Sequence, residues 1–157
     1  DRFLMKLLVG YGNDEEERKI LQLVRGEEKA ADTKVEAPLP QSLVFDGRAE
    51  IHKVFSSEAI EKYIVALVAA TRRPGDFSAD LKAWIQVGAS PRGTLALDRC
   101  ARAHAWLKGR DHVTPDDVRA IAPDCLRHRL ILTYEAVADG ITPDRVVAEV
   151  LKQVALP

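Results

Sequence analysis

Helix-start signals recur along this 157-residue chain and limit the folds open to it. A hydroxyl residue is followed directly by proline at residues 90–91, 114–115 and 142–143, and aspartate follows the last two pairs. A Ser or Thr side chain caps the unpaired amides of a first helical turn, and proline is favoured at the first helical position. Apolar residues follow each signal, so we predict three separate helices in the second half of the chain.

Two more helices are predicted in the first half. Asn13 is followed three residues later by Glu16, as in a capping box, and we expect that helix to end at Gly26. Ser57 precedes an amphipathic pattern that should run to about Thr71. The predicted fold class is therefore all-α, a bundle of about five or six helices. The apolar positions of the second pattern are Ile60, Tyr63, Ile64, Leu67 and Val68.

The remaining segments carry weaker signals. Residues 3–9 are apolar except for Lys6 and of strand length, and we interpret them as one short buried strand without its sheet partners. Residues 27–50 are polar and contain two prolines, which predicts a mobile loop with one turn of helix near residues 41–45. Residues 131–134 are compatible with an extended conformation, and Pro123 is expected to kink or restart its helix.

Charge and cysteine content exclude several classes of protein. The chain has 23 basic and 24 acidic side chains, a net charge of -1, so no bulk field attracts nucleic acid or an acidic membrane. No apolar run reaches the roughly 20 residues that span a bilayer, and no secretory signal is present. Cys100 and Cys125 form no CxxC pair, which favours buried thiols and a cytoplasmic location.

The residues alone indicate little chemistry. No Gly-rich GxxxxGK[ST] loop is present to hold nucleotide phosphates, and the four histidines have no metal-binding spacing, so no metal site is predicted. Two arginines lie in unusual places. Arg2 directly precedes the strand-like run, and Arg92 lies in a first helical turn, where its charge opposes the helix dipole. Solvated surface arginines and functional arginines both remain open at this point.

Several motifs agree in order and spacing with one known family. They are Asp-Arg-Phe at residues 1–3, Gly-Ala-Ser-Pro-Arg-Gly at 88–93, Gly-Arg-Asp-His-Val-Thr-Pro-Asp-Asp at 109–117 and Leu-Arg-His-Arg-Leu at 126–130. With these motifs the chain closely resembles the C-terminal part of MoxR-family AAA+ ATPases. The match covers nearly the whole chain and is weak only across residues 27–50.

The resemblance implies roles for both unusual arginines. Arg2 corresponds to an arginine finger that acts in trans on a neighbouring subunit's nucleotide, and Arg92 to a sensor 2 arginine that binds the nucleotide from the lid. It also implies that ATP and Mg are bound by the full-length parent, an ATPase, whereas this fragment binds neither tightly and is inactive alone. The implied partners are a homo-oligomeric ring, a hexamer with chaperone-like action, and client proteins with von Willebrand factor A domains.

The resemblance also divides the chain into parts. Residues 1–12 would be the terminal strand of the AAA+ α/β core, which is otherwise missing, and residues 13–157 the helical lid domain. Because the sequence begins at Asp1 without Met, we expect a cut through a larger folded protein. The alternatives are a stand-alone helical module that binds proteins or nucleic acid, and the lid of a magnesium-chelatase-like or helicase-type AAA+ ATPase.

Overall fold

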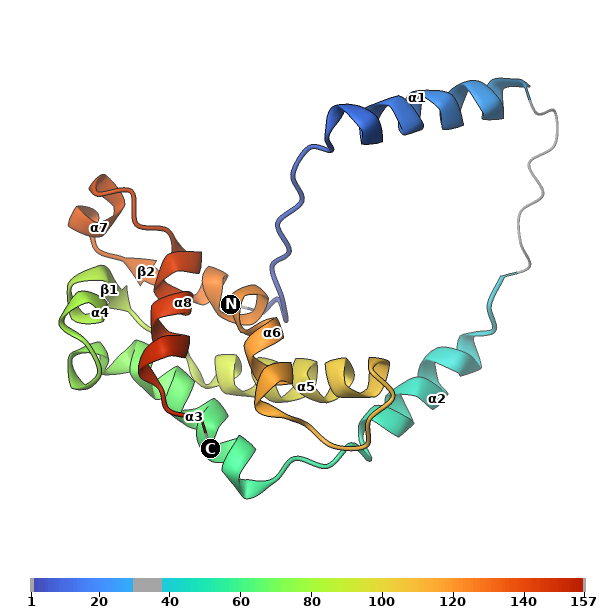
Figure 1. Cartoon of the computed structure of the whole chain (residues 1–157). Coiled ribbons are helices and arrows are strands. Elements are labelled where there is room, and N and C mark those ends of the chain that lie inside the picture. Colours follow the sequence, from blue (N-terminus) through green and yellow to red (C-terminus); the bar gives the residue numbers. More distant parts are fainter. Residues whose placement is uncertain (1, 30–37, 157) are drawn as a thin grey trace. The chain divides into compact units, whose positions relative to one another are not determined.

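The structure is a computed structural model that describes residues 2–29 and 38–156 (Figure 1). The described residues divide into two compact units, one of residues 2–6 with 46–156 and one of residues 7–29 with 38–45. We call the first the bundle unit and the second the α1 unit. Arg2 and Arg92, the two site residues predicted from the sequence, both belong to the bundle unit.

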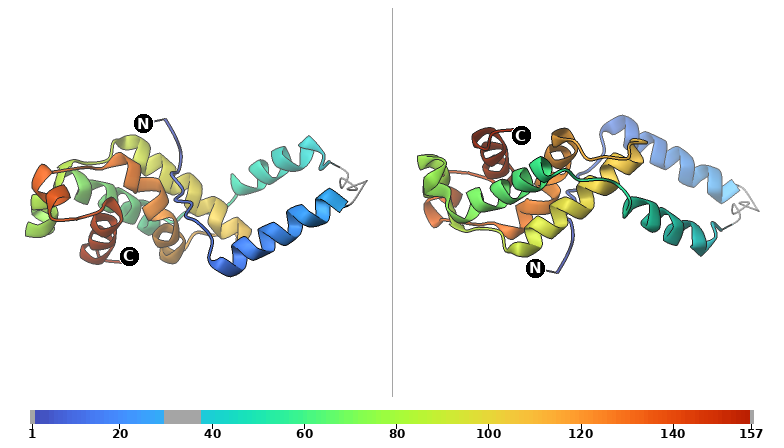
Figure 2. Two further views of the ribbon diagram at one scale, coloured as in Figure 1. Left: turned by 90° about the horizontal axis from the view of Figure 1, so that it is seen from above. Right: turned by 90° about the horizontal axis from the view of Figure 1, so that it is seen from below.

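The bundle unit is almost entirely helical, as its two further views also show (Figure 2). Within its described residues it contains six complete α-helices, which confirms the predicted all-α fold. The elements are α3 (Glu58–Arg72), the 3-10 turn η1 (Pro74–Asp76), α4 (Ala79–Trp84), β1 (Ile85–Val87), α5 (Pro91–Leu107), α6 (Pro115–Leu126), the 3-10 turn η2 (Arg127–Arg129), β2 (Ile131–Leu132), α7 (Tyr134–Ala138) and α8 (Pro143–Gln153).

The predicted caps begin the long helices. The Ser57 hydroxyl accepts a hydrogen bond from the Ile60 amide at 3.3 Å, and Ser90 accepts one from the Arg92 amide at 3.3 Å. Thr142 caps α8 in the same way. Because these side chains satisfy amides that lack an intrahelical partner, the helix starts could be read from local sequence. Helix α6 continues through Pro123 to Leu126 without the expected restart.

The core lies between the four long helices. Helices α5 and α6 pack most extensively against each other, and α3 and α8 cover them. Small side chains on α5, among them Ala96, Ala101 and Ala105, are fully buried and let α6 approach closely. The larger side chains at the centre include Leu67, Leu97, Val118, Leu126 and Val147.

A short antiparallel ribbon joins two connections of the bundle. Ile85 of β1 lies opposite Leu132 of β2, and Val87 lies opposite Ile131. The extended conformation expected for residues 131–134 is therefore present at Ile131–Leu132. The short helices α4 and α7 were not predicted, because six and five residues are too few for a helical period to be recognised.

The strand predicted at residues 3–9 does not form: the described residues 2–13 contain neither helix nor strand. Their backbone finds other partners. The Lys6 amide donates to the Asp124 carbonyl at 2.9 Å, and the Lys6 carbonyl accepts from Arg127 at 2.6 Å. The prediction of a buried strand was therefore wrong, and most apolar side chains of the run are exposed. The Asp124 carbonyl and the Arg127 side chain bond to the Lys6 backbone in place of a neighbouring strand.

The α1 unit contains helix α1 (Asp14–Lys29) and the start of helix α2 (Gln41–Ile51). The capping box is confirmed, since the amides of Asn13 and Glu16 each bond the other's side chain at 2.9 Å. Helix α1 nevertheless continues past Gly26, where we expected it to end.

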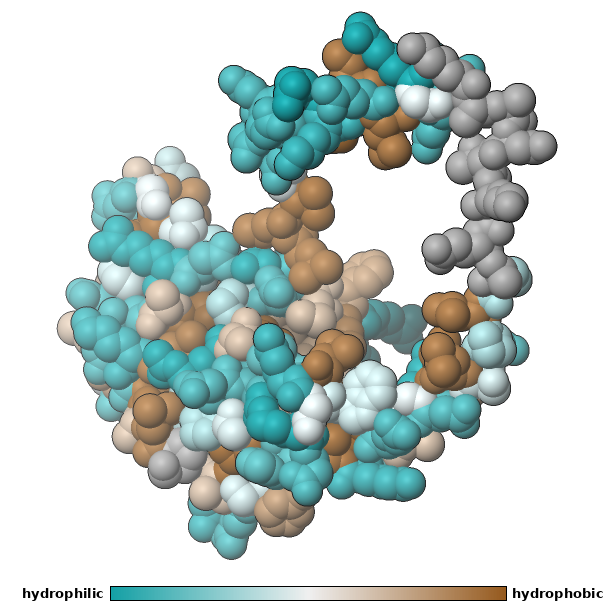
Figure 3. Space-filling model, turned by 45° about the vertical axis from the view of Figure 1, so that its right-hand side comes forward, coloured by the Kyte–Doolittle hydropathy of each residue, from teal (hydrophilic) through white to brown (hydrophobic). Residues whose placement is uncertain are grey.

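The loop predicted at residues 27–50 is largely replaced by helix, because α1 extends into it and α2 is far longer than the single turn expected. Residues 30–37 of that predicted loop lie outside the described residues. Both helices carry exposed apolar side chains, which appear as brown areas in Figure 3. They are Ile20, Leu21, Leu23 and Val24 on α1, and Leu43, Val44 and Phe45 on α2.

Candidate functional site

The segment that carries Arg2 is fixed by its backbone. Arg129 donates one hydrogen bond from Nη2 to the Phe3 carbonyl at 2.8 Å and another from Nη1 to the Leu4 carbonyl at 3.3 Å. The same guanidinium also donates to the Cys125 carbonyl. Together with the Lys6 contacts, these bonds tie residues 3–6 to the end of α6 and to η2. Arg2 is therefore the residue just before an anchored segment.

The turn before α5 is held in place by hydrogen bonds to the end of α3. The Ala89 amide donates to the Thr71 hydroxyl at 3.0 Å, and the Ala89 carbonyl accepts from Nε of Arg72 at 2.6 Å. Both Thr71 and Ala89 are 1% exposed, so these bonds are shielded from water. They set the position of the turn that ends in the Ser90 cap and leads into Arg92.

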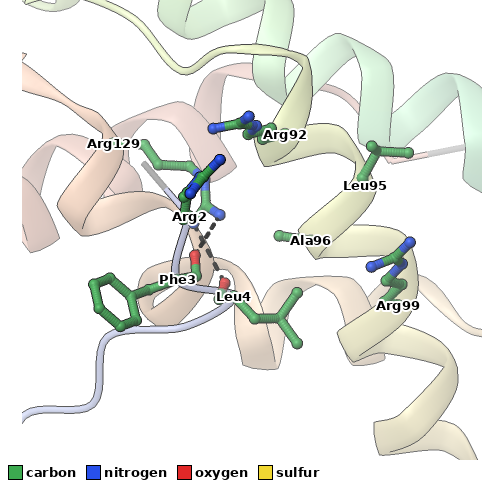
Figure 4. Close-up of a pocket in the computed structure, with 8 residues that line it drawn as sticks. All are labelled: Arg2, Phe3, Leu4, Arg92, Leu95, Ala96, Arg99 and Arg129. Carbon is green, nitrogen blue, oxygen red and sulfur yellow. Dashed lines mark hydrogen bonds between the residues drawn. The ribbon is translucent and has the colours of Figure 1, made fainter.

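The anchored segment and α5 enclose an open pocket of about 510 Å³. Figure 4 shows Arg2 and Arg92 at one end of it, Arg99 further along α5, and Arg129 behind the segment. Four of the eight residues that line this pocket are arginines, and none of the described lining residues is acidic. We call it the arginine pocket. The other lining residues are Phe3, Leu4, Leu95 and Ala96.

The four arginines differ in exposure. Arg2, Arg92 and Arg99 are exposed, whereas Arg129 is only 8% exposed. Its guanidinium contacts three backbone carbonyls and Nε2 of His128. Burial lowers the pKa of Arg129 from its ordinary value, although an arginine stays protonated far above neutral pH. The arrangement concentrates positive charge beside accessible space, and it suits an anion with several negatively charged oxygens.

The two arginines singled out from the sequence thus lie in one pocket, and two others were missed. Arg99 follows Arg92 by seven residues, a spacing that returns to the same face of a helix and could have indicated it. Arg129 lies in the 126–130 motif, but its contacts with Phe3 and Leu4 span more than 120 residues of sequence. No local signal predicts a contact of that range.

A second polar cluster lies at the start of α6 and is structural. Asp117 is 0% exposed and accepts hydrogen bonds from Arg110 at 2.6 and 2.5 Å and from the Thr114 amide and hydroxyl at 2.8 Å. Nδ1 of His104 lies 2.7 Å from the same carboxylate. Burial alone would raise the pKa of Asp117, but the bonds from Arg110, Thr114 and His104 hold it well below its usual range.

The remaining candidate residues show no catalytic arrangement. Cys100 and Cys125 are both buried, as expected, and the contact with Cys100 together with burial raises the pKa of the Cys125 thiol. Within residues 2–29 and 38–156, no group of three or more His, Cys, Asp or Glu side chains is placed to hold a metal ion. No helix in the described part of the chain is long and apolar enough to cross a bilayer.

Known proteins share this fold. The family model described as "AAA lid domain" matches residues 79–150, a range that includes Arg92, Arg99 and Arg129. The chain is 40% identical to "Chaperone MoxR1" of Mycobacterium tuberculosis, over 100% of this chain and 41% of that protein. It is 41% identical to "Protein MoxR" of Methylorubrum extorquens, over 62% of this chain and 30% of that protein.

A solved structure extends the likeness to three dimensions. A crystal structure of a Cytophaga hutchinsonii protein assigned as an ATPase superposes with a TM-score of 0.91 at 36% identity, over 99% of this chain and 47% of that one. The chain therefore carries an AAA lid domain. It matches the C-terminal part of MoxR-family AAA+ ATPases along its whole length, and it spans less than half the length of these relatives.

Proposed function

We propose that this chain is the lid of a ring-forming ATPase, and that its arginine pocket binds the terminal phosphates of ATP. The observation that carries the proposal is the meeting of Arg2 and Arg92 in one pocket beside Arg99 and Arg129. Arg92 is the sensor 2 residue in this proposal, and Arg2 is the arginine finger that a subunit presents to its neighbour.

Phosphoryl-transfer chemistry supports both assignments. As the γ-phosphoryl group leaves, negative charge spreads over its oxygens, and guanidinium groups placed there stabilise the transition state. Arg92 lies in the first turn of the 17-residue helix α5, where the helix dipole also favours an anion. A bound phosphate would offset the repulsion between the helix dipole and the Arg92 charge.

The rest of the proposed activity belongs to the parent protein. The phosphate loop and the acidic residues that hold Mg would come from its α/β core, and residues 1–12 would be the end of that core. The chain alone should not hydrolyse ATP and should bind nucleotide weakly. In the full ring, a hexamer, nucleotide-driven movement of the lid would act on client proteins, including partners with von Willebrand factor A domains.

The proposal predicts a loss of ATP turnover in the full-length protein. Arg92→Ala and Arg2→Ala should each lower turnover at saturating ATP by about tenfold or more, because each removes a charge that stabilises the transition state. Arg102→Ala is the matched control, since Arg102 lies on α5 and pairs with Asp98 at 2.5 Å rather than lining the pocket. Steady-state phosphate release measures the effect, and wild-type turnover in both pocket variants would refute the assignments.

A mixing experiment tests action in trans. Full-length subunits with Arg2→Ala are combined with subunits that keep Arg2 but lack a working phosphate loop. If Arg2 acts on a neighbour's nucleotide, the mixture should regain part of the wild-type turnover, because each defective subunit supplies what its neighbour lacks. Turnover no higher than that of the separate variants would contradict a finger supplied by the neighbour.

A further inference from the structure

We infer that the solvent-facing side of α3 is a self-complementary surface, which pairs two copies of this chain with their α3 helices antiparallel. We call this surface the α3 face. The inference goes beyond the proposed function, because a closed ring is built from head-to-tail contacts, whereas a face that matches itself joins two chains about a two-fold axis. The α3 face consists of Glu58, Glu61, Lys62, Val65, Ala66, Ala69 and Arg73, together with Phe77.

The first step concerns the position of this face on the helix. Its members on α3 are spaced three or four residues apart along two adjacent rows, so they lie on one side of the helix. The opposite side, which includes Ile64, Leu67 and Val68, is buried in the core of the bundle unit. Val65 is apolar but 55% exposed. The α3 face is therefore not needed for the core of its own chain.

The second step concerns shape. Lys62 and Ala66 line two hollows, one of about 520 Å³ and one of about 350 Å³. The larger hollow is also lined by Val65, Ala69 and Phe77. Small side chains at positions 66 and 69 leave room for the backbone of another helix to approach closely. A ridge between two hollows is the form that helices pack against, and a second α3 offers the matching ridge.

The third step concerns charge, which indicates a second copy as the occupant. Glu58 lies in the first turn of α3, and Arg73 directly follows its last residue. These two positions are equally far along the chain from the midpoint between Val65 and Ala66. When two copies of α3 are antiparallel about that midpoint, Glu58 of each chain therefore meets Arg73 of the other. Two ion pairs form, one at each end, and Val65 packs on Ala66 in the middle.

The balance of charge on the α3 face supports the same occupant. Two acidic and two basic side chains line the larger hollow, so a second copy is not repelled. The acidic residues lie at the start of α3 and Arg73 at its end. A partner of one uniform charge would therefore meet repulsion at one end, whereas an antiparallel copy meets the opposite charge at both.

The ion pairs within one chain do not oppose this pairing. Nζ of Lys62 lies 2.6 Å from the Glu58 carboxylate, and Nε of Arg73 lies 3.8 Å from the Asp76 carboxylate. All four side chains are more than 60% exposed, and exposed ion pairs of this kind contribute little to stability. Glu58 and Arg73 can therefore take a partner in a second chain at small cost.

Sedimentation equilibrium of the 157-residue chain, at concentrations from about 10 µM to about 1 mM, tests the pairing. A single helix pair buries less than the roughly 1,600 Å² of a standard interface, so we expect a reversible dimer with a Kd on the order of 100 µM. Glu58→Arg and Arg73→Glu should each weaken it about tenfold, because both symmetry-related pairs become repulsive. Glu135→Arg, an exposed reversal in the first turn of α7, is the control and should change Kd less than about twofold.

Two combinations of these variants test the antiparallel orientation. The double variant Glu58→Arg with Arg73→Glu should regain the wild-type Kd, because each end again meets the opposite charge. An equimolar mixture of the two single variants should also associate as tightly as wild type, since one chain is then basic at both ends and the other acidic at both ends. A parallel pair would give no recovery in the double variant.

A further variant tests the centre of the face without changing its ends. Val65→Glu places two like charges beside the two-fold axis and should abolish the dimer, and circular dichroism verifies that this variant and the charge reversals are folded. A wild-type chain that stays monomeric up to about 1 mM would overturn the inference. So would association that persists unchanged in Val65→Glu and in both charge reversals, because the chain would then pair through another surface. Neither result bears on phosphate binding in the arginine pocket, so the proposed function is tested separately.

Discussion

Replacing Asp117 with asparagine should destabilise the bundle unit by about 2–3 kcal/mol, because the charged acceptor of a buried hydrogen-bond cluster is lost. The Asp117 side chain is 1% exposed, so water cannot take over the bonds that it forms with Arg110 and Thr114. An asparagine amide would also place N–H donors against groups that themselves donate. Urea unfolding at neutral pH measures the loss.

The neighbouring residue supplies a matched control. Asp116 lies in the same first turn of α6 but is exposed, so Asp116→Asn should change the free energy of unfolding by less than about 1 kcal/mol. Equal effects of the two substitutions would show that the Asp117 cluster contributes nothing beyond the helix dipole.

The same carboxylate predicts how stability depends on pH. Its partners hold the pKa of Asp117 below the value of about 3.9 that an unfolded aspartate has. The folded state therefore binds this proton less readily than the unfolded state. The contribution is fully present above about pH 5 and is lost as the pH falls below about 4. The stability difference between wild type and Asp117→Asn should accordingly shrink between pH 7 and pH 3 in urea titrations.

Gly88→Ala should destabilise the bundle unit by about 3 kcal/mol or more, because its backbone has no room for a methyl group. A Cβ at Gly88 would lie 2.2 Å from the carbonyl oxygen of Thr71 and 2.8 Å from the amide nitrogen of Arg72. Backbone atoms cannot move aside as a side chain can. The turn would shift away from α3 and strain both bonds to Ala89.

A second glycine gives the comparison for this prediction. A Cβ at Gly26 in α1 would meet nothing within 4 Å, so Gly26→Ala should leave stability unchanged or raise it by up to about 1 kcal/mol. Thermal unfolding followed by circular dichroism distinguishes the two. A wild-type unfolding temperature for Gly88→Ala would mean that the turn is not tightly held against α3.

Features encoded locally could be predicted from the sequence. Ser57, Ser90 and Thr142 begin helices because a side chain three or fewer residues away satisfies the first amides, and this needs no knowledge of the fold. Gly26 was misjudged because a glycine inside a helix costs only about 1 kcal/mol, which the rest of α1 can offset.

Features that depend on distant partners could not be predicted. The run at residues 3–9 looked like a strand, since an apolar stretch does not reveal what its backbone will bond to. Arg92 was noticed for its unfavourable place in a first turn, whereas Arg129 looked like an ordinary basic residue. Only the folded chain shows that Arg129 reaches Phe3 and Leu4. The pocket is thus a product of tertiary contacts between segments that the sequence keeps far apart.

The anchor of residues 3–6 recognises main-chain atoms. Arg127 and Arg129 bond to carbonyl groups, and Asp124 accepts from an amide through its own carbonyl. Every amino acid offers that carbonyl, and every one except proline offers that amide. The anchor therefore does not depend on the side chains of Phe3, Leu4 and Lys6. Substitutions at these three positions should leave Arg2 in place.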